Sequence, residues 1–373
     1  MFKFSELKNV ELEITNRCQA SCPMCPRNIN GGIDNPSLKI NDWTIDDFIK
    51  IFNKKVLEQI SSFLFCGSFG EPVLNNDLLK MCQYIQKEKP DAFVMIHSNG
   101  SLRKPDWWAD LAKSLPEKHQ VLFAIDGVDQ YTHSRYRIGT DFDKILENAK
   151  SFIDSGGKAT WSFLRFKHNQ EQTDAAEELA KKIGFSQFSV KDTRRFAAPT
   201  HKVLDSEGNI THLLEPITVG PMHYVDKTVL DKTFDRWSTS KSIYCYALNG
   251  KSVYIDAHFT VLPCCILSSF LYTSYDESIL KKYNLYNEKT SVNTMGKFIK
   301  DQVFEMIDEL GGFESLDARN NGIKNIIETE TWKTIWEEKW KSAGSLTCSL
   351  MCSSDSPFIP MQEQFTKKSQ ISD

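Results

Sequence analysis

The sequence lacks several features that would assign the protein to a membrane, secreted or nucleic-acid-binding class. No segment has the long uncharged apolar run of a membrane-spanning helix, and the first residues lack the apolar core of a signal peptide. The formal net charge is only −4, which argues against a nucleic-acid binder that relies on a broad basic surface. No internal repeat or low-complexity tract is present. These absences predict a cytoplasmic globular protein without a membrane partner or a nucleic-acid partner.

What is present is enough apolar sequence for two domains and an unusual number of cysteines. A chain of 373 residues, of which 40% are hydrophobic, is long for one domain. Ten cysteines in a reducing compartment indicate metal ligands or buried thiols rather than disulfides.

Three of these cysteines lie within eight residues, directly after an apolar, β-prone segment. Cys18, Cys22 and Cys25 have the spacing C-x3-C-x2-C and follow residues 10–15. Thiolates suit iron–sulfur clusters or zinc, and a four-iron cluster usually takes four cysteines. Three close cysteines therefore indicate a cluster with one open iron, which binds a small molecule. The alternative is a zinc site completed by a distant ligand.

This cysteine stretch resembles the hallmark of the radical S-adenosylmethionine (radical SAM) superfamily. The resemblance implies that Cys18, Cys22 and Cys25 hold a [4Fe-4S] cluster whose open iron binds the amino and carboxylate groups of SAM. One electron then cleaves SAM to methionine and a 5′-deoxyadenosyl radical, which removes a hydrogen atom from the substrate. The residue before the third cysteine is usually aromatic and lies near the adenine. Here it is Met24, a departure, although methionine also packs on rings.

Strand-like and helix-like segments alternate through the first half of the chain. A capping box of Thr44 and Asp47 begins one of these helices and Gly184 ends another. Strands that alternate with helices predict a parallel sheet, and six of them match the partial (β/α)6 barrel of radical SAM enzymes. The expected fold class is α/β, with this barrel over residues 1–195. The six expected strands are residues 10–15, 61–66, 92–97, 120–125, 161–166 and 185–190.

The turn after the second strand is a candidate SAM-binding loop. Two glycines at a strand end let the backbone approach a ligand closely, although a glycine-rich turn with a solvated glutamate is the simpler interpretation. After the cysteine motif, the turn resembles the family's GGE motif, which binds the SAM amino group. Gly70 and Glu71 match by identity, whereas Phe69 replaces the first glycine and is expected to offer a backbone contact.

The next two strand ends supply further candidate SAM contacts. Ser98 and Asn99 resemble the segment that contacts the SAM ribose, although Asn99-Gly100 is also a common turn. Arg137 follows His133 at the family's spacing, and an arginine here can hold the SAM carboxylate through paired hydrogen bonds. The alternative for Arg137 is a solvated side chain in a charged turn.

Cysteines return in the second half in an arrangement that resembles the SPASM/twitch extension of radical SAM enzymes. This resemblance implies a small α+β domain with one auxiliary [4Fe-4S] cluster. Two features depart from the family pattern: Phe259 stands at the usual glycine, and the final pair is spaced C-x3-C. Cys265 is an alternative to Cys264, and a structural four-cysteine zinc site is the competing interpretation. The expected ligands are Cys245, Cys264, Cys348 and Cys352.

The domain division expected for the second half has three parts. Residues 196–240 form a polar linker that carries a hairpin near Gly208, and residues 361–373 form a frayed polar tail. Between them lies the SPASM/twitch-like domain, residues 241–360, with an insertion at 268–322. Within this domain the pattern indicates a hairpin over 252–264 and helices over 295–310 and 331–340.

The sequence therefore predicts a radical SAM oxidoreductase or maturase that uses SAM and two [4Fe-4S] clusters. By the resemblance, the first expected substrate is a peptide or protein, and the auxiliary cluster is an electron acceptor or relay. Dehydrogenation of a small molecule is the alternative, and a zinc-binding structural protein or nucleic-acid partner is the rival from another class. A flavodoxin or ferredoxin is the expected reductant. No catalytic acid or base is assigned, and Asp126, Tyr254 and His258 are candidates to line the cavity.

Overall fold

The computed structural model is built on one nine-stranded sheet with the order β12-β11-β1-β4-β5-β6-β7-β8-β13. The strands from β11 to β8 run parallel to their neighbours, whereas β12 and β13 are antiparallel at the two edges. An α/β fold with a parallel sheet is thus confirmed. The residues that the structure describes are 2–193, 195–196, 199–217, 243–272, 277–283, 285, 292–341, 346–352 and 365–370.

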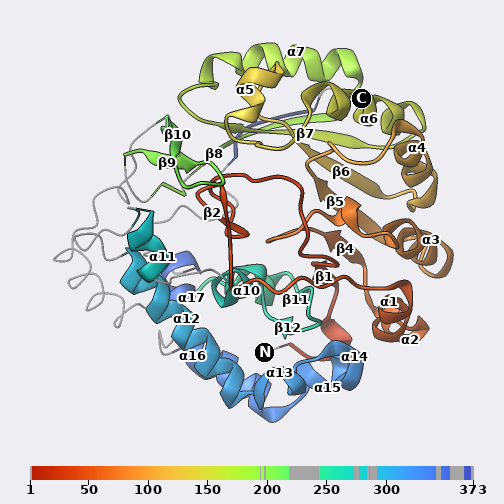
Figure 1. Ribbon diagram of the computed structural model, residues 1–373. Coiled ribbons are helices and arrows are strands. Elements are labelled where there is room, and N and C mark those ends of the chain that lie inside the picture. The colour runs from red at the N-terminus through yellow and green to blue at the C-terminus, as the bar shows by residue number, and fades with distance from the viewer. Residues whose placement is uncertain are drawn as a thin grey trace.

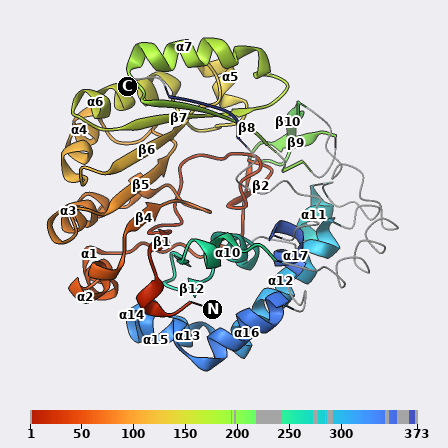
Figure 2. The same cartoon turned by 180° about the vertical axis from the view of Figure 1, so that it is seen from behind.

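The six strands expected in the first half form neighbouring strands of this sheet in chain order. Each of the first five is followed by helical segments on the outer side of the curved sheet, whereas β8 is followed by a strand hairpin (Figures 1 and 2). The strands are β1 (Asn9–Leu12), β4 (Ser62–Phe65), β5 (Phe93–Ser98), β6 (His119–Ala124), β7 (Ala159–Arg165) and β8 (Gln187–Asp192). The helices are α1 (Ile45–Ile51), α2 (Lys54–Gln59), α3 (Leu78–Glu88), α4 (Pro105–Ser114), α5 (Gln130–Ser134), α6 (Phe142–Asp154) and α7 (Thr173–Ile183).

Local signals place the ends of these helices as expected. Thr44 caps α1 in a capping box, because its side chain accepts the Asp47 N–H and the Asp47 carboxylate accepts the Thr44 N–H. Gly184 ends α7 with φ +103°, a left-handed conformation that suits glycine. The expected helix starts and stops are therefore confirmed at both positions.

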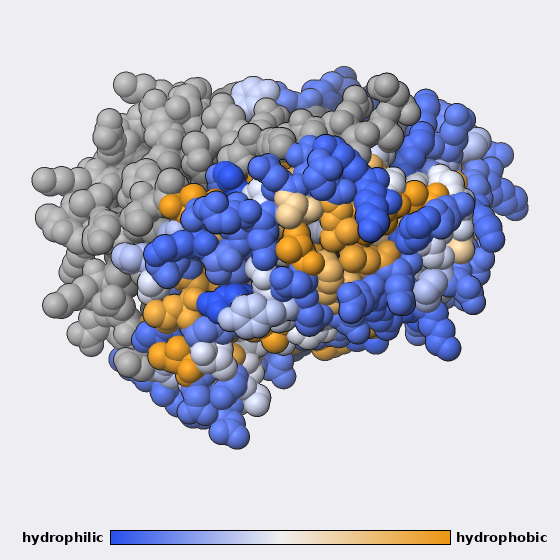
Figure 3. All heavy atoms as spheres, turned by 90° about the horizontal axis from the view of Figure 1, so that it is seen from above, coloured by the Kyte–Doolittle hydropathy of each residue, from blue (hydrophilic) through white to orange (hydrophobic). Residues whose placement is uncertain are grey.

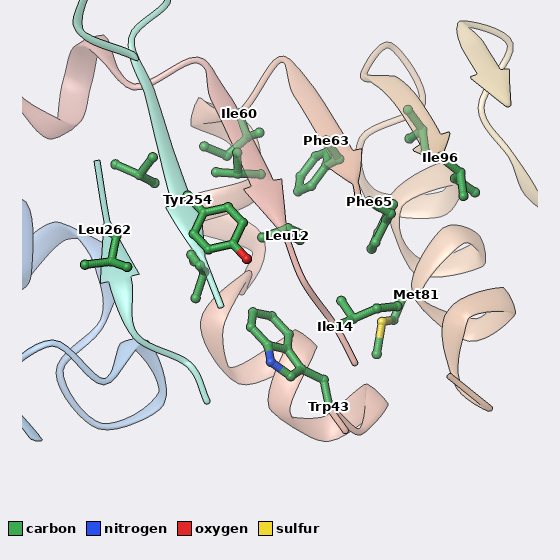
Figure 4. Packing of buried hydrophobic residues seen from close by; sticks show 14 of the residues in the cluster. Leu12, Ile14, Trp43, Ile60, Phe63, Phe65, Met81, Ile96, Tyr254 and Leu262 are labelled. Carbon is green, nitrogen blue, oxygen red and sulfur yellow. The ribbon is translucent and has the colours of Figure 1, made fainter. Parts of the chain in front are cut away.

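Alternate residues of each strand pack into the outer layer and leave the others facing the inside of the curved sheet. Phe63 and Phe65 of β4 are fully buried and contact the ring of Phe48 on α1 at 6.4 and 6.2 Å. Figure 4 shows these side chains beside Leu12 of β1. Leu64 between them and Ser62 before them are only partly buried, so they face the inner side.

The second half continues the same sheet. β11 (Ser252–Ile255) pairs parallel to β1 and antiparallel to β12 (Val261–Leu262), which confirms the expected hairpin. That the hairpin extends the first-half sheet was not predicted. The expected helices are also present, over α12 (Val292–Glu309) and α16 (Glu330–Lys341). The remaining helices of this half are α9 (Tyr246–Asn249), α10 (Cys265–Tyr272), α11 (Glu277–Lys282), α13 (Gly312–Ser315), α14 (Ala318–Asn321), α15 (Ile323–Ile327) and α17 (Leu346–Cys352).

The expected polar tail is wrong for residues 365–370. These residues form β13 (Phe365–Gln370), which pairs antiparallel with β8. The physical reason is that β8 would otherwise end the sheet with unpaired backbone groups. The linker holds the expected hairpin, β9 (His201–Leu204) with β10 (Ile210–Leu214), whereas its residues 218–240 lie outside the described part of the chain.

Three smaller features complete the description. A two-stranded hairpin, β2 (Asn28–Ile29) with β3 (Ile33–Asp34), follows the cysteine triplet, and three one-turn 3-10 helices are η1 (Phe4–Glu6), η2 (Pro72–Leu74) and η3 (Gln170–Gln172). Among the described residues, no helix has the length and apolar character needed to span a bilayer. On the face seen from above, hydrophobic residues reach the surface in an area bordered by hydrophilic ones (Figure 3).

Candidate active site

The candidate residues of the first half gather where the parallel strands end. Cys18 follows β1, Glu71 follows β4, Asn99 follows β5, and Asp126 follows β6. Because parallel strands have their carboxyl ends at one edge, these loops meet at the same end of the sheet. Sites in parallel α/β folds commonly lie at that end.

The three cysteines of the triplet lie close enough for their charges to interact. Burial, followed by the nearby charge of Glu71, raises the pKa of Cys18, and the neighbouring thiols raise it further. Burial and the charge of Cys22 raise the pKa of Cys25 to about 11. Their surroundings are an apolar cluster that includes Ala20, Tyr136 and Phe166.

This donor set fits an iron–sulfur cluster. Three thiols crowded in an apolar place stay protonated unless positive charge compensates them, and a metal centre supplies that charge. The protein adds cations as well, because Arg137 Nη1 lies 3.9 Å from Cys22 Sγ and Arg195 opposes the rise in the pKa of Cys22 and Cys25. The triplet therefore combines soft thiolate ligands with nearby arginines whose positive charge favours the deprotonated thiols.

Glu71 is buried beside the triplet and joins two strand ends. Its Oε2 accepts the N–H of Asn99 at 2.7 Å and its Oε1 accepts the N–H of Val73 at 3.2 Å. Burial raises the pKa of Glu71, while hydrogen bonds from Asn99 and Ser98 oppose that rise. The carboxylate is thus a fixed group, not a solvated one.

Gly70, the residue before Glu71, lies directly against the backbone of Thr15, three residues after the end of β1. A Cβ atom built on Gly70 would stand 1.8 Å from the carbonyl oxygen of Thr15, so only glycine fits. Phe69 turns its buried ring toward Tyr272, with 5.6 Å between ring centroids, and its N–H points to Glu13. The loop is therefore held by backbone contacts.

The residues expected near the ribose already have partners in the structure. Ser98 Oγ accepts the N–H of Gly100 at 2.9 Å. Asn99 Oδ1 accepts from the Gln19 amide at 2.9 Å, and Asn99 Nδ2 lies 3.9 Å from Cys18 Sγ. Gln19, between two of the cysteines, is a site residue that no sequence signal indicated.

Arg137 belongs to a buried network after β6. Its Nε donates to Asp126 Oδ2 at 2.6 Å, and burial raises the pKa of Asp126 against the opposing charge of Arg137. His133 Nδ1 accepts the Asp126 N–H at 3.1 Å, and its Nε2 lies 2.9 Å from Thr140 Oγ1, which donates to the Arg137 carbonyl. The network holds the guanidinium beside Cys22.

The remaining first-half candidates divide between the site and its surroundings. Met24 packs against the same apolar cluster as the triplet. Tyr254 is fully buried and donates to Glu13 at 2.8 Å. His258 lies at the periphery, where its Nε2 is 3.0 Å from the carbonyl oxygen of Lys39.

The cysteines of the second half also come together. The pKa of Cys264 is raised by burial and then by the charges of Cys348, Cys245 and Cys352. The charges of Cys348 and Cys245, after burial, raise the pKa of Cys352 to about 12. The N–H of Tyr244 donates to the Cys352 carbonyl at 2.6 Å, which joins the two segments.

Cys265 faces a different set of groups. Its thiol lies 3.6 Å from the Tyr246 hydroxyl, and the charge of Glu11 on β1 raises its pKa after burial. Cys66 interacts with the same Glu11 and Cys265, and Cys82 is fully buried on α3.

Within the described residues, no three His, Cys, Asp or Glu side chains converge tightly enough to hold a single metal ion.

Comparisons with known proteins match one family model over part of the chain. Residues 12–183, just under half of the chain, match the model of the Radical SAM superfamily, and no curated protein matches the chain. Similar solved structures include Streptococcus suis SuiB bound to precursor peptide SuiA, with 15% identity over 72% of this chain and 61% of that chain and a TM-score of 0.48. Another is anSMEcpe with bound AdoMet, with 13% identity, 88% and 79% coverage and a TM-score of 0.49. BtrN in complex with AdoMet and 2-DOIA has 11% identity, 97% and 98% coverage and a TM-score of 0.44.

Proposed function

We propose that this chain is a radical SAM enzyme whose reactive [4Fe-4S] cluster is held by Cys18, Cys22 and Cys25. One observation carries the proposal: three electrostatically coupled thiols lie beside Glu71, Asn99 and Arg137 at the carboxyl ends of parallel strands. The matched family model covers the same region. When bound, the cluster supplies the electron that cleaves SAM to methionine and a 5′-deoxyadenosyl radical, which takes a hydrogen atom from the substrate.

The chain's own residues bind and orient SAM in this proposal. Glu71 and the Gly70 backbone face the SAM amino group, and Arg137 pairs with the SAM carboxylate. Asp126 accepts from the Arg137 Nε, and Cys22 Sγ lies 3.9 Å from its Nη1. The guanidinium has further N–H groups that can donate to a carboxylate. Met24 packs near the adenine, and Phe69 contributes its backbone. Ser98 and Asn99 shape the ribose side.

A second [4Fe-4S] cluster at Cys245, Cys264, Cys348 and Cys352 is also part of the proposal. The mutual pKa effects of these four thiols support it, and the orientation of Cys265 toward Glu11 supports Cys264 as the ligand. With four thiolates the cluster has no open iron, so it serves as an electron acceptor or relay. A flavodoxin or ferredoxin is the proposed reductant.

For the substrate we propose a peptide or protein side chain, from the resemblance of the cysteine pattern to SPASM/twitch enzymes. Oxidation of a small alcohol is the alternative. Assays with candidate peptides and with small alcohols, read by mass spectrometry, distinguish the two. Only the true class of substrate should give a product whose mass is lower by two hydrogens.

The decisive experiment is SAM cleavage. The protein is purified and reconstituted without oxygen, reduced, mixed with SAM, and assayed for 5′-deoxyadenosine beside the Cys18/Cys22/Cys25→Ala variant. Product from the wild type alone supports the proposal, whereas an iron-loaded, reduced wild type that neither binds nor cleaves SAM contradicts it.

Iron analysis tests the auxiliary cluster separately. Two four-iron clusters give about eight iron atoms per chain, and the triple variant should retain about four. Cys264→Ala should lose about four, whereas the matched control Cys265→Ala should lose none. Zinc without iron or sulfide in the purified protein would instead favour a structural metal-binding role.

A further inference from the structure

A buried carboxylate outside the cysteine motifs accepts two backbone hydrogen bonds from the candidate SAM loop. Glu13 follows β1 and is 1% exposed. Its Oε1 accepts two backbone N–H groups, from Phe69 at 2.6 Å and from Gly70 at 3.1 Å. Its Oε2 accepts the hydroxyl of Tyr254 at 2.8 Å.

These three hydrogen bonds join segments that are far apart in the sequence. Phe69 and Gly70 immediately precede Glu71, and Gly70 lies against Thr15 too closely for any Cβ. Tyr254 belongs to β11 of the second half, and Figure 4 shows it beside β1. One side chain therefore fixes the loop to β1 and ties both to the second half.

Near neutral pH the Glu13 carboxylate populates both its charged and its neutral form. Burial raises the pKa of Glu13 to about 7, although the hydrogen bonds from Phe69, Tyr254 and Gly70 lower it. The titratable groups that face it are Tyr254, Asp256, Tyr272 and Cys66. Burying a carboxylate costs free energy unless it is fully hydrogen-bonded. We therefore assign Glu13 the role of accepting the three hydrogen bonds from Phe69, Gly70 and Tyr254.

We propose that Glu13 is a positioning residue that holds residues 67–71 in the arrangement SAM binding requires and couples this loop through Tyr254 to the second half of the chain. The SAM part of this inference rests on the proposed function. Glu13 itself touches the loop and not SAM, so it acts through Gly70 and Glu71.

Two variants separate acceptor geometry from charge. Glu13→Gln keeps an oxygen for both N–H groups, and its amide can donate to the Tyr254 hydroxyl. Glu13→Ala leaves both N–H groups buried without an acceptor. Tyr254→Phe keeps the hydrogen bonds from Phe69 and Gly70 to Glu13 and removes the hydroxyl that bonds Glu13 and lies 3.4 Å from Ser68 Oγ.

The loop is tested first in the protein without cluster or SAM, by hydrogen–deuterium exchange of the Phe69 and Gly70 amides. Glu13→Ala should exchange about tenfold faster than the wild type, as expected for a lost buried hydrogen bond, while Glu13→Gln stays within about threefold. Equal exchange in the wild type and Glu13→Ala overturns the holding role.

SAM affinity is then measured by equilibrium dialysis on the reconstituted protein, at matched iron content. The Kd should rise about tenfold in Glu13→Ala, little in Glu13→Gln, and to an intermediate extent in Tyr254→Phe. The ratio of the wild-type Kd to the Glu13→Gln Kd should fall from pH 6 to pH 8, because only the wild type gains a charged acceptor.

The outcomes distinguish this inference from the proposed function. Faster exchange with an unchanged Kd in Glu13→Ala overturns the link to SAM binding. A wild type that does not bind SAM overturns the proposed function and the SAM part together, while the exchange rates still decide whether Glu13 holds the loop.

Discussion

At the scale of single residues, Phe259 shows how packing overrides backbone preference. It stands at the position where the resembled pattern has glycine, and it adopts φ +70°, which disfavours a side chain. Its ring is buried, stacks on Trp43 at 5.0 Å between centroids, and lies 3.6 Å from the Arg319 guanidinium carbon. The aromatic and cation–π contacts outweigh the backbone strain.

Phe259→Ala should therefore destabilise the protein by about 3–5 kcal/mol, because a buried ring is lost. Phe259→Gly loses the same contacts but relieves the left-handed strain, so it should be more stable than the alanine variant by about 1 kcal/mol. Urea unfolding followed by tryptophan fluorescence measures both. A glycine variant as stable as the wild type would show that strain dominates.

His133 provides the pH-dependent prediction at this scale. Burial, and then the charge of Arg137, lowers its pKa to about 3, and its Nδ1 accepts the Asp126 N–H. The lowered pKa means that the stability due to neutral His133 is present above its ordinary value of 6.5 and is lost as the pH falls.

Between pH 7 and pH 5 the wild type should lose about 2 kcal/mol of unfolding free energy through His133. His133→Asn keeps an acceptor for Asp126 and does not titrate, so it should lack this component. The measurement is urea unfolding at both pH values. Equal losses in the two proteins would assign the effect to other groups.

At the scale of elements, close backbone approach decides how the loop after β4 is held. Gly67 and Gly70 leave no room for a Cβ, since the built atoms would stand 1.5 Å from Gly70 O and 1.8 Å from Thr15 O. Gly156, at the end of α6, has φ +92° but nothing within 4 Å. Comparing Gly70 with Gly156 therefore separates the effect of a steric clash from the effect of a left-handed backbone.

Gly70→Ala should cost about 1–3 kcal/mol of stability through steric displacement and weaken SAM binding. The matched control Gly156→Ala should cost about 1 kcal/mol for its left-handed backbone and leave the SAM Kd unchanged. Thermal denaturation and equilibrium dialysis report the two effects. An equal Kd in wild type and Gly70→Ala would contradict the assigned role of this loop.

The edge strand β13 gives a second prediction at this scale. It covers β8, and an uncovered edge strand exposes backbone groups that pair with other chains. A chain that ends at residue 364 should therefore self-associate, whereas one that ends at residue 370 should not. Size-exclusion chromatography with light scattering measures this, and a monomeric shorter chain would show that β8 tolerates exposure.

At the scale of the whole molecule, the described residues of both halves share one buried hydrophobic cluster and one sheet. β11 lies beside β1 over four residue pairs, from Asn9 with Ser252 to Leu12 with Ile255. Trp43 reaches the same region by stacking on Phe259. The two halves are therefore expected to unfold together.

A fragment of residues 1–217 lacks β11 and exposes the β1 edge and Trp43. It should be less stable than the full chain and should aggregate on concentration. Soluble yield and the urea midpoint, compared with those of the full chain, test this. A monomeric fragment with the full chain's midpoint would mean that the first half folds independently.

Much of the fold could be predicted because its signals are local. The alternation of strands and helices and the caps at Thr44 and Gly184 all depend on residues a few positions apart. Glu13 was missed although residues 10–15 alternate apolar and polar side chains, a pattern that places Glu11 and Glu13 on one inner face. Gln19 carried no such signal, because its partner Asn99 is 80 residues away.

The sequence by itself determined the cysteine spacing, the order of strands and helices, and the candidate residues at the strand ends. Each of these follows from periodicity or ligand chemistry within a short stretch of chain. Tertiary structure decided the pairing of β11 with β1, the covering of β8 by β13, and the direction in which Cys264 and Cys265 face. It also placed Tyr254 on Glu13 across 241 residues. Such contacts depend on which distant surfaces bury one another, and no local pattern encodes that.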